Sequence, residues 1–211
     1  TGLATGFTYN TGTHIWSWSC LGQFSGSDAS CSSQELYCGD GAVNSTWEVD
    51  ENFIVSKNPI TNEAGNNTSS IAYVSAGGRF TSFHSNASNL VTWDVNGVAD
   101  VFVYDKENNT LENITLSWNA ASSQSSISSD GRYVAFRSNA TNLVWGDTNG
   151  IWDVFVYDRQ TQVMKNITIT WNAGTQQRVT MTADGRYITF ESPSNNLVAW
   201  DAWNLDVFVY D

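Results

Sequence analysis

Two acidic loops carry the residue types and the spacing best suited to bind a metal ion. The pattern Asp-x-Asn-Gly-x-x-Asp occurs twice, with its oxygen-bearing side chains at Asp94, Asn96 and Asp100 and again at Asp147, Asn149 and Asp153. Oxygen ligands at alternating positions around a glycine suit a hard cation such as Ca²⁺. Each loop lacks the additional acidic ligand of a full calcium loop, and the same side chains can instead satisfy backbone donors in a turn. The pattern therefore predicts either a calcium site or a polar turn, and no other cofactor is expected.

Residues able to catalyse a reaction are sparse. Only His14 and His84 could act as a base near neutral pH, and the nucleophile-elbow, zinc-protease and phosphate-loop motifs are absent from the sequence. The position of His84 holds Arg137 and Glu191 in related segments of the chain, which suits an exposed site better than a general base. Most acidic residues recur at fixed intervals, whereas a catalytic pair needs two acids within one site. We therefore expect no enzymatic activity.

Tryptophans crowd the long polar turns of the chain. They are Trp93, Trp145, Trp152, Trp200 and Trp203. Exposed tryptophans there would stack on a glycan or contact a protein ligand, whereas buried ones would pack between neighbouring sheets. Trp152 is matched by Ala99 in an earlier segment, so we expect its side chain to be exposed. The candidate binding residues are Trp145, Trp152, Trp200 and Trp203.

Eight N-x-S/T sequons favour an exported, glycosylated protein. They begin at Asn44, Asn66, Asn67, Asn86, Asn108, Asn113, Asn139 and Asn166. Glycosylation would require both export and surface exposure of these asparagines. Four of the sequons recur in matching positions, so an inherited repeat pattern is the alternative explanation for them.

The three cysteines lie near the start of the chain. Cys20 and Cys31 enclose a short loop rich in glycine and serine, and we predict a disulfide between them. Cys38 is then left over, either buried or available to another chain. The spacing does not match a zinc site. Together with the sequons, the cysteines favour an extracellular or cell-surface location.

Composition and charge limit the partners of the protein. The 211 residues include 9 Lys and Arg against 21 Asp and Glu, a net charge of −12. Such a surface repels nucleic-acid backbones and anionic lipid, so neither is an expected partner. No apolar run approaches the length of a membrane span. The sequence begins at Thr1 without a signal peptide, and we expect a processed chain or a fragment.

A block that occurs three times must position these residues. Residues 85–105, 138–158 and 192–211 are close copies, and the arginines that precede them, Arg79, Arg132 and Arg186, are spaced by 53 and then 54 residues. Residues 131–138, 153–158 and 163–170 have the composition and alternation of strands, and a shorter strand is expected around residues 177–181. Four short antiparallel strands in a unit of about 50 residues predict the blade of a β-propeller.

The repeated residues also carry a family resemblance. The run S-x-D-G-R-Y-V-A-F followed by D-x-N-G-x-x-D-V-F-V-Y-D resembles the TolB-like β-propeller repeats of bacterial and archaeal secreted and periplasmic proteins. It covers residues 70–211 in three consecutive copies. The first copy departs from it with Gly77-Gly78 in place of Asp-Gly, and the third lacks one residue between Asp201 and Asp206. The resemblance implies an all-β propeller that acts outside the cytoplasm.

The N-terminal residues carry two shorter resemblances. Residues 16–33, WSWSCLGQFSGSDASCSS, resemble an element of modular bacterial cell-surface proteins. The run Cys38-Gly-Asp-Gly41 resembles the start of a cysteine-rich surface repeat, although Val49 stands where a cysteine normally follows. Both resemblances imply a place outside the cell.

We predict an N-terminal β segment followed by about four blade equivalents. The segment, a connector or part of the first blade, covers residues 1–45. The blades are a degenerate unit over 46–70, with strands at 47–50 and 53–61, and units over 71–123, 124–177 and 178–211. The last unit would lack one strand, and residues 2–10 have the length and alternation to pair with its edge, in the same chain or in a neighbour.

Pairing with a neighbour would produce a head-to-tail polymer. We therefore expect a self-associating, non-enzymatic extracellular protein, the glycosylated subunit of a coat or filament. The alternative is a glycan-, peptide- or calcium-binding module of a secreted or surface receptor or adhesin.

Overall fold

The computed structural model describes residues 52–176, 178–196, 198 and 204–211, together with the backbone of the short strands β1 to β5. The chain divides into two compact units, Thr1–Phe53 and Ile54–Asp211. The division comes later than the predicted boundary after residue 45. Both units consist of β-strands, as predicted, and no described helix is long and apolar enough to cross a membrane.

The first unit contains two small antiparallel sheets. One has the order β1-β2-β3 and consists of β1 (Ala4–Asn10), β2 (Ile15–Cys20) and β3 (Ala29–Ser32). The other pairs β4 (Leu36–Tyr37) with β5 (Val43–Asn44). β1, predicted to pair with the edge of the last strand in the same chain or in a neighbour, pairs on one side with β2. Strands that are adjacent in sequence meet at a lower cost in loop entropy than distant ones.

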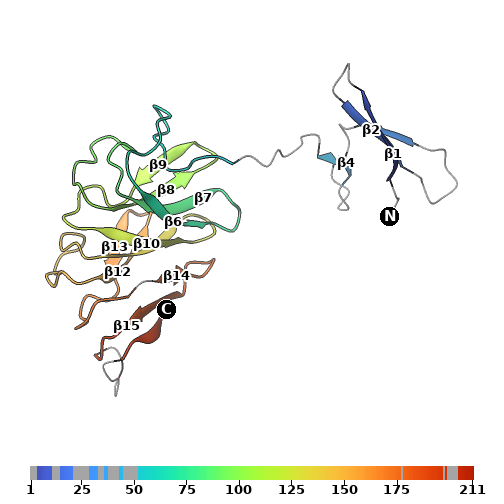
Figure 1. The fold of residues 1–211 in the computed structure, drawn as a ribbon. Helices are drawn as coiled ribbons and strands as arrows, with labels where there is room; N and C mark the ends of the chain where they lie inside the picture. Colours follow the sequence, from blue (N-terminus) through green and yellow to red (C-terminus); the bar gives the residue numbers. More distant parts are fainter. Residues whose placement is uncertain are drawn as a thin grey trace. The chain divides into compact units, whose positions relative to one another are not determined.

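The second unit, which we call the repeat region, contains three consecutive antiparallel sheets (Figure 1). The first consists of β6 (Ser69–Val74), β7 (Phe80–Ser85), β8 (Asp100–Asp105) and β9 (Thr110–Asn113). The second consists of β10 (Ser122–Ile127), β11 (Tyr133–Ser138), β12 (Asp153–Asp158) and β13 (Val163–Asn166). The third consists of β14 (Val179–Met181), β15 (Ile188–Ser192) and β16 (Asp206–Tyr210).

Each sheet is a meander whose spatial order follows the sequence, which confirms the predicted all-β, blade-like architecture. The described sheets do not close into a ring. The strand expected around residues 177–181 pairs with β15, after the turn, so it begins a sheet rather than ending the previous one.

The predicted strand over residues 53–61 is wrong. Residues 52–68 form bends and turns, with one isolated bridge between Lys57 and Ala64. The side chain of Asn58 accepts the backbone N–H groups of Ile60 and Thr61, at 2.9 and 3.1 Å, which closes a local turn. Pro59 has no N–H to offer a ladder. Local hydrogen bonds therefore replace those of a strand.

Corresponding strands pair in the same register, which gives each sheet two distinct faces. One face carries a cross-strand phenylalanine pair, and we call it the phenylalanine face. The pairs are Phe83–Phe102, Phe136–Phe155 and Phe190–Phe208, with ring centroids 5.5, 5.8 and 5.9 Å apart. The other face, the valine face, carries the alternate residues of β8, β12 and β16, because successive side chains of a strand point to opposite sides.

The valine faces of the first and second sheets pack on the phenylalanine face of the sheet that follows. Val101 and Val103 of the first sheet share a buried cluster with Phe136 and Phe155 of the second. Val154 of the second sheet is buried in the same way against the third. Burial of such a side chain contributes about 1.5–3 kcal/mol, so these contacts hold consecutive sheets together.

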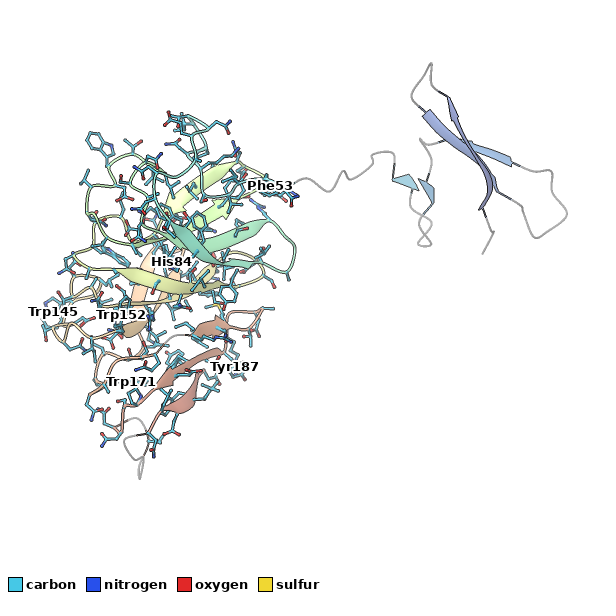
Figure 2. The ribbon with its side chains drawn as sticks, viewed as in Figure 1. Phe53, His84, Trp145, Trp152, Trp171 and Tyr187 are labelled. Atoms are coloured by element: carbon cyan, nitrogen blue, oxygen red, sulfur yellow. The ribbon has the colours of Figure 1, made fainter. Side chains whose placement is uncertain are left out.

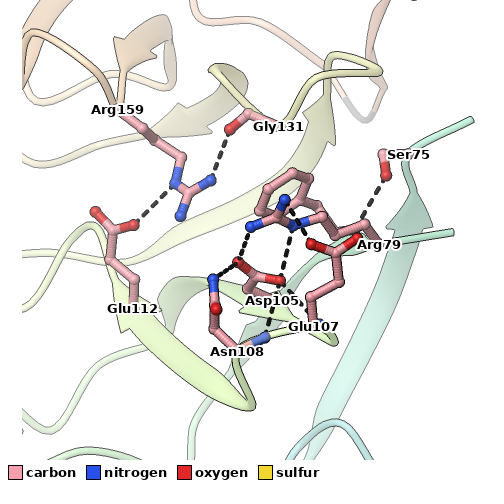
Figure 3. A network of polar contacts seen from close by, with 9 residues as sticks. Ser75, Arg79, Asp105, Glu107, Asn108, Glu112, Gly131 and Arg159 are labelled. Carbon is pink, nitrogen blue, oxygen red and sulfur yellow. Dashed lines mark hydrogen bonds and ion pairs between the residues drawn. The ribbon is translucent and has the colours of Figure 1, made fainter. Parts of the chain in front are cut away.

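An ion pair closes each copy of the repeat. Arg79 Nε and Nη2 donate to the two carboxylate oxygens of Asp105, at 3.0 and 2.8 Å (Figure 3). This contact lowers the pKa of Asp105 to about 2. Arg132 with Asp158 and Arg186 with Asp211 repeat the arrangement. The recurrence of these residues in the sequence is therefore architectural.

A second arginine joins neighbouring sheets. Arg159 Nε donates to Glu112 at 2.8 Å, and its Nη1 donates to the carbonyl oxygen of Gly131 at 2.7 Å (Figure 3). The same guanidinium lies 5.2 Å from the ring centroid of Phe80. The side chain of Arg159 thus contacts residues of both the first and the second repeat.

Three asparagine side chains tie the start of each sheet to the loop after its second strand. Asn89 accepts the N–H of Asn66 at 2.8 Å and donates to the carbonyl of Ala64 at 3.0 Å. Asn142 and Asn196 make the same two bonds to the segments before the second and third sheets. The sequence places these asparagines in polar turns, but it does not reveal that each of them bonds to the backbone of the segment before its sheet.

The glycine of the Asp-Gly turn gives a test of sheet stacking. Gly131 has φ +71°, and a Cβ added there would lie 2.2 Å from the ring of Phe80 in the preceding sheet. Gly78 has nearly the same φ, +72°, but faces open space. We expect Gly78→Ala to cost about 1–2 kcal/mol through backbone strain alone, and Gly131→Ala to cost clearly more. Urea unfolding of both variants measures the difference; equal losses would contradict the proposed contact.

Candidate functional site

The first acidic loop forms a hydrogen-bonded cluster around Asp100. Its buried carboxylate accepts Thr115 Oγ1 at 2.5 Å, Asn113 Nδ2 at 3.1 Å and Asn96 Nδ2 at 3.1 Å. The Thr115 hydroxyl oxygen in turn accepts the backbone N–H of Val101 at 2.9 Å. Burial raises the pKa of Asp100, and the hydrogen bonds from these neutral donors oppose that rise. The cluster fixes where β9 ends against β8.

The second acidic loop repeats this cluster around Asp153. Thr168 Oγ1 donates to one carboxylate oxygen of Asp153, and Asn149 Nδ2 donates to the other at 3.1 Å. Asn166 donates to Asp147 Oδ2 at 3.0 Å. The remaining oxygen, Asp147 Oδ1, is buried and has no hydrogen-bond partner among the residues that the structure describes.

Paired carboxyl groups distinguish these loops from ordinary turns. Asp94 is 7% exposed and shares a hydrogen bond with Asp100. Burial, and then the charge of Asp100, raise the pKa of Asp94 to about 6. Two carboxyl groups in one buried site do not both ionise easily, so a proton on Asp94 can be donated to Asp100.

The calcium prediction gains no support from this geometry. The side-chain oxygens of Asn96 and Asn149, expected to be ligands, accept the backbone N–H groups of Val98 and Ile151 at 3.1 and 3.0 Å. Their amide nitrogens point to the carboxylates. Within the described residues, no group of three or more His, Cys, Asp or Glu is gathered as a metal site. The loops therefore act as polar turns here, and calcium binding stays a prediction.

The predicted binding tryptophans differ in their exposure. Trp145 is 99% exposed, and Figure 2 shows it at the surface of the repeat region. Trp152, expected to be exposed, is partly buried, because Arg137 lies 4.4 Å from its ring centroid. Trp200 and Trp203 fall outside the described residues. Trp93, which is 80% exposed, was not among the predicted binding residues.

Within the described residues, His84 has no acidic partner that would make it a base. Its Nε2 lies 3.1 Å from the Ser70 hydroxyl, and burial, followed by the charge of Arg137, lowers its pKa. The neighbouring Arg137 donates to the carbonyl oxygen of Gln176 at 2.7 Å. Neither arrangement resembles an oriented catalytic pair.

The sequons divide into engaged and free asparagines. Asn113 and Asn166 hold Asp100 and Asp147 through their amide nitrogens, the atoms a glycan would occupy, which argues against glycans there. Asn66 and Asn108 are exposed but bonded to Ser88 and Asp105. Asn139 is partly buried.

Two sequons remain compatible with glycosylation in the described chain. Asn67 and Asn86 are exposed, and no described contact engages their amide nitrogens. The side chain of Asn44 lies outside the described residues.

The cysteine prediction concerns residues of which only the backbone is described. Cys20 pairs with Ala29, and Cys31 pairs with Trp18, so the two cysteines are diagonal rather than opposite. Diagonal positions of neighbouring strands are about 7–8 Å apart, longer than the usual span of a disulfide. The register gives the disulfide no support, and it stays a prediction. Cys38 lies outside the described residues.

The raised pKa of Asp94 predicts that the stability of the fold decreases as the pH rises. Its pKa is higher in the folded chain than in the unfolded one, so its charge destabilises the fold, with the effect growing between about pH 4 and pH 6. We expect Asp94→Asn to raise the melting temperature at pH 7.5 and to leave it unchanged at pH 4. Asp130, whose pKa is lowered by its bond from Ser128, is the control. Asp130→Asn should lower the melting temperature at pH 7.5; a loss in both variants would contradict the raised pKa of Asp94.

Glycan occupancy should follow the contacts of each asparagine. After secretion from a eukaryotic host, we expect glycans on Asn67 and Asn86 and none on Asn113 or Asn166 of the folded protein. Mass spectrometry of glycopeptides measures the occupancy of each site. Glycans on Asn113 in folded material would mean that its bond to Asp100 is dispensable.

Comparison with known proteins gives similarity of fold only. No protein-family model and no curated protein sequence matches the chain. Solved structures similar to it include TolB from Acinetobacter baumannii, with 14% identity, a TM-score of 0.45, and coverage of 97% of this chain and 38% of that one. The tricorn protease has 20% identity and a TM-score of 0.44, with coverage of 69% of this chain and 13% of that one.

An acylaminoacyl peptidase from Pyrococcus horikoshii has 16% identity and a TM-score of 0.39, with coverage of 60% of this chain and 17% of that one. The chain therefore spans well under half the length of each of these proteins. The meander order and shared register of the sheets characterise the repeat region as a run of blade-like antiparallel sheets.

Proposed function

We propose that this chain is a non-enzymatic extracellular structural protein, a glycosylated subunit of a surface coat or filament. The observation that carries the proposal is the outer edge of β16 and the valine face of the third sheet, which no strand of the described residues covers. The strongly acidic composition and the exposed sequons support a place outside the cell. The described surroundings of His84, which hold the Ser70 hydroxyl and the charge of Arg137 but no acidic partner, support a role without catalysis.

The outer edge of β16 carries backbone N–H and C=O groups whose counterparts in the first sheet form hydrogen bonds. In the first sheet, Val101 accepts the N–H of Ile114 at 3.0 Å and donates to Thr115 Oγ1, both beyond β8 on the side of β9. Val207 occupies the matching place in β16, opposite Glu191 as Val101 is opposite His84. No strand in the described residues pairs with this side of β16. Its N–H and C=O groups are therefore ready to bind an added strand.

The valine face of the third sheet is apolar and exposed. Val207 and Val209 are 72% and 63% exposed, whereas the matching Val101 and Val103 are 0% and 1% exposed. Leu205 adds a further exposed apolar side chain, at 57%. Each such side chain contributes about 1.5–3 kcal/mol when buried, so association at this face is favourable.

Strand β1 of another copy is the proposed occupant of the edge. It has seven residues, more than the four of β9 and β13, and it lies at the edge of its own sheet. One side of β1 is therefore available for a second pairing. Because the donor and acceptor are different parts of the chain, each added copy exposes a new acceptor, and a filament results.

A ligand-binding module is the second candidate function. It is favoured by the exposed Trp93 and Trp145 on corresponding loops.

The open edge can be tested with variants that leave the fold intact. Val209→Pro removes an outward N–H, and Val207→Asp places a charge on the exposed face. We expect electron microscopy and sedimentation to show filaments for the unaltered chain and dispersed particles for both variants, with melting temperatures unchanged. Val95→Asp is the control, because Val95 is 86% exposed in a loop away from β16.

Deletion of residues 1–10 identifies the donor, and it should also disperse the filaments. Loss of filaments in the β16 variants alone would mean that a different segment fills the edge. Dispersed particles from the unaltered chain, or filaments from every variant, would overturn the proposal.

A further inference from the structure

The first and second sheets each expose a tryptophan side chain on the loop that joins their second and third strands. Trp145, between β11 and β12, is 99% exposed, and Trp93, between β7 and β8, is 80% exposed. The three other described tryptophans contact the fold. Trp118 stacks on Phe136 and Trp171 packs against Phe190, with ring centroids 5.9 and 5.0 Å apart, and Arg137 lies 4.4 Å from the ring centroid of Trp152. The two loop tryptophans bury little of their large apolar surface, so both rings are available to stack on a ligand.

The backbone at Trp93 argues against a structural role. Its φ is +71°, a conformation that side chains other than glycine rarely adopt. The matching residue of the next repeat is Gly146, with φ +90°. A bulky residue in this region costs about 1–3 kcal/mol, and the exposed ring recovers little of it by packing. Strain without a packing gain is typical of residues kept for binding.

A concavity beside Trp145 supplies polar groups. It has a volume of about 590 Å³ and is lined by residues 141–148, which include Thr148 and Asp147. Asp147 Oδ1 has no hydrogen-bond partner in the described structure. A buried carboxylate oxygen without a donor is costly, so a ligand that brings hydroxyl donors would satisfy it.

We propose that these loops bind a carbohydrate polymer, with Trp145 and Trp93 as stacking platforms on adjacent sheets. The inference rests on the second candidate function, the ligand-binding module. Sugar rings present C–H faces that pack on the negative face of an indole, and hydroxyl groups that donate to carboxylates. The net charge of −12 opposes a nucleic acid. The lining of the concavity at Trp145 mixes Thr, Asn and Asp with Leu143 and Val144, whereas the centre of a protein interface is depleted of charged side chains.

Native gel electrophoresis in gels containing cellulose derivatives, soluble chitin derivatives, xylan or dextran tests the proposal on the full chain. We expect at least one polymer to retard the protein, and Trp145→Ala to weaken the affinity about tenfold. Trp145→Phe should restore part of it. Val95→Ala, which changes an exposed apolar residue in the same loop as Trp93, should have no effect.

Trp93→Gly separates a binding role from a structural one. The variant should lose affinity while its melting temperature rises, because glycine relieves the positive φ. A fall in melting temperature would show that Trp93 supports the fold. Retardation by none of the polymers, retardation that Trp145→Ala leaves unchanged, or tryptophan-dependent binding of peptides alone would overturn the proposal.

We expect polymer binding and filament formation to be lost in different variants. The tryptophan variants should still form filaments, and Val209→Pro should still be retarded by the polymer. Filament loss without binding loss would therefore concern only the structural function.

Discussion

Every sheet of the repeat region depends on its successor to bury one of its two faces. In the first sheet, which is followed by another, Val101 and Val103 are almost fully buried against the second sheet. The third sheet shows the consequence of lacking one in the described chain, since Val207 and Val209 are exposed. Because apolar burial is the main favourable contribution to folding, the stability of such a region increases with each sheet added.

Polar side chains provide the specificity that apolar stacking lacks. Flat apolar faces would tolerate shifts along the strands, whereas the Arg79–Asp105 ion pair and the Asn89 bonds fix one register. The cluster around Asp100 sets the end of the fourth strand in the same way. The abundance of Asn, Ser, Thr and Asp in the sequence thus reflects contacts made once in each repeat. These contacts also explain why most acidic residues recur in frame.

Much of the fold could be predicted from the sequence, because alternation and turn residues are local signals. Strands β7 and β8 and their repeats follow from them directly. The segment over residues 53–61 was misassigned because its apolar residues resemble a strand, while the turn made by Asn58 and Pro59 depends on side-chain bonds that hydrophobicity does not reveal.

The site was less predictable than the fold, since burial depends on neighbours distant in sequence. The ring of Trp152 lies against Arg137, and the side chain of Asn113, in a glycosylation motif, donates a hydrogen bond to Asp100. The strain at Trp93 had a visible signal in the alignment of the repeats, because Gly146 occupies the matching position.

The asparagine bonds between a loop and the segment before its sheet have an evolutionary consequence. Asn89, Asn142 and Asn196 each bind the backbone rather than a particular side chain of that segment. A tandem duplication of one period, wherever its ends fall, therefore recreates every junction without a compensating mutation. Gene segments of this kind can lengthen or shorten by recombination while each intermediate still folds, so the number of repeats is free to drift faster than the residues within them.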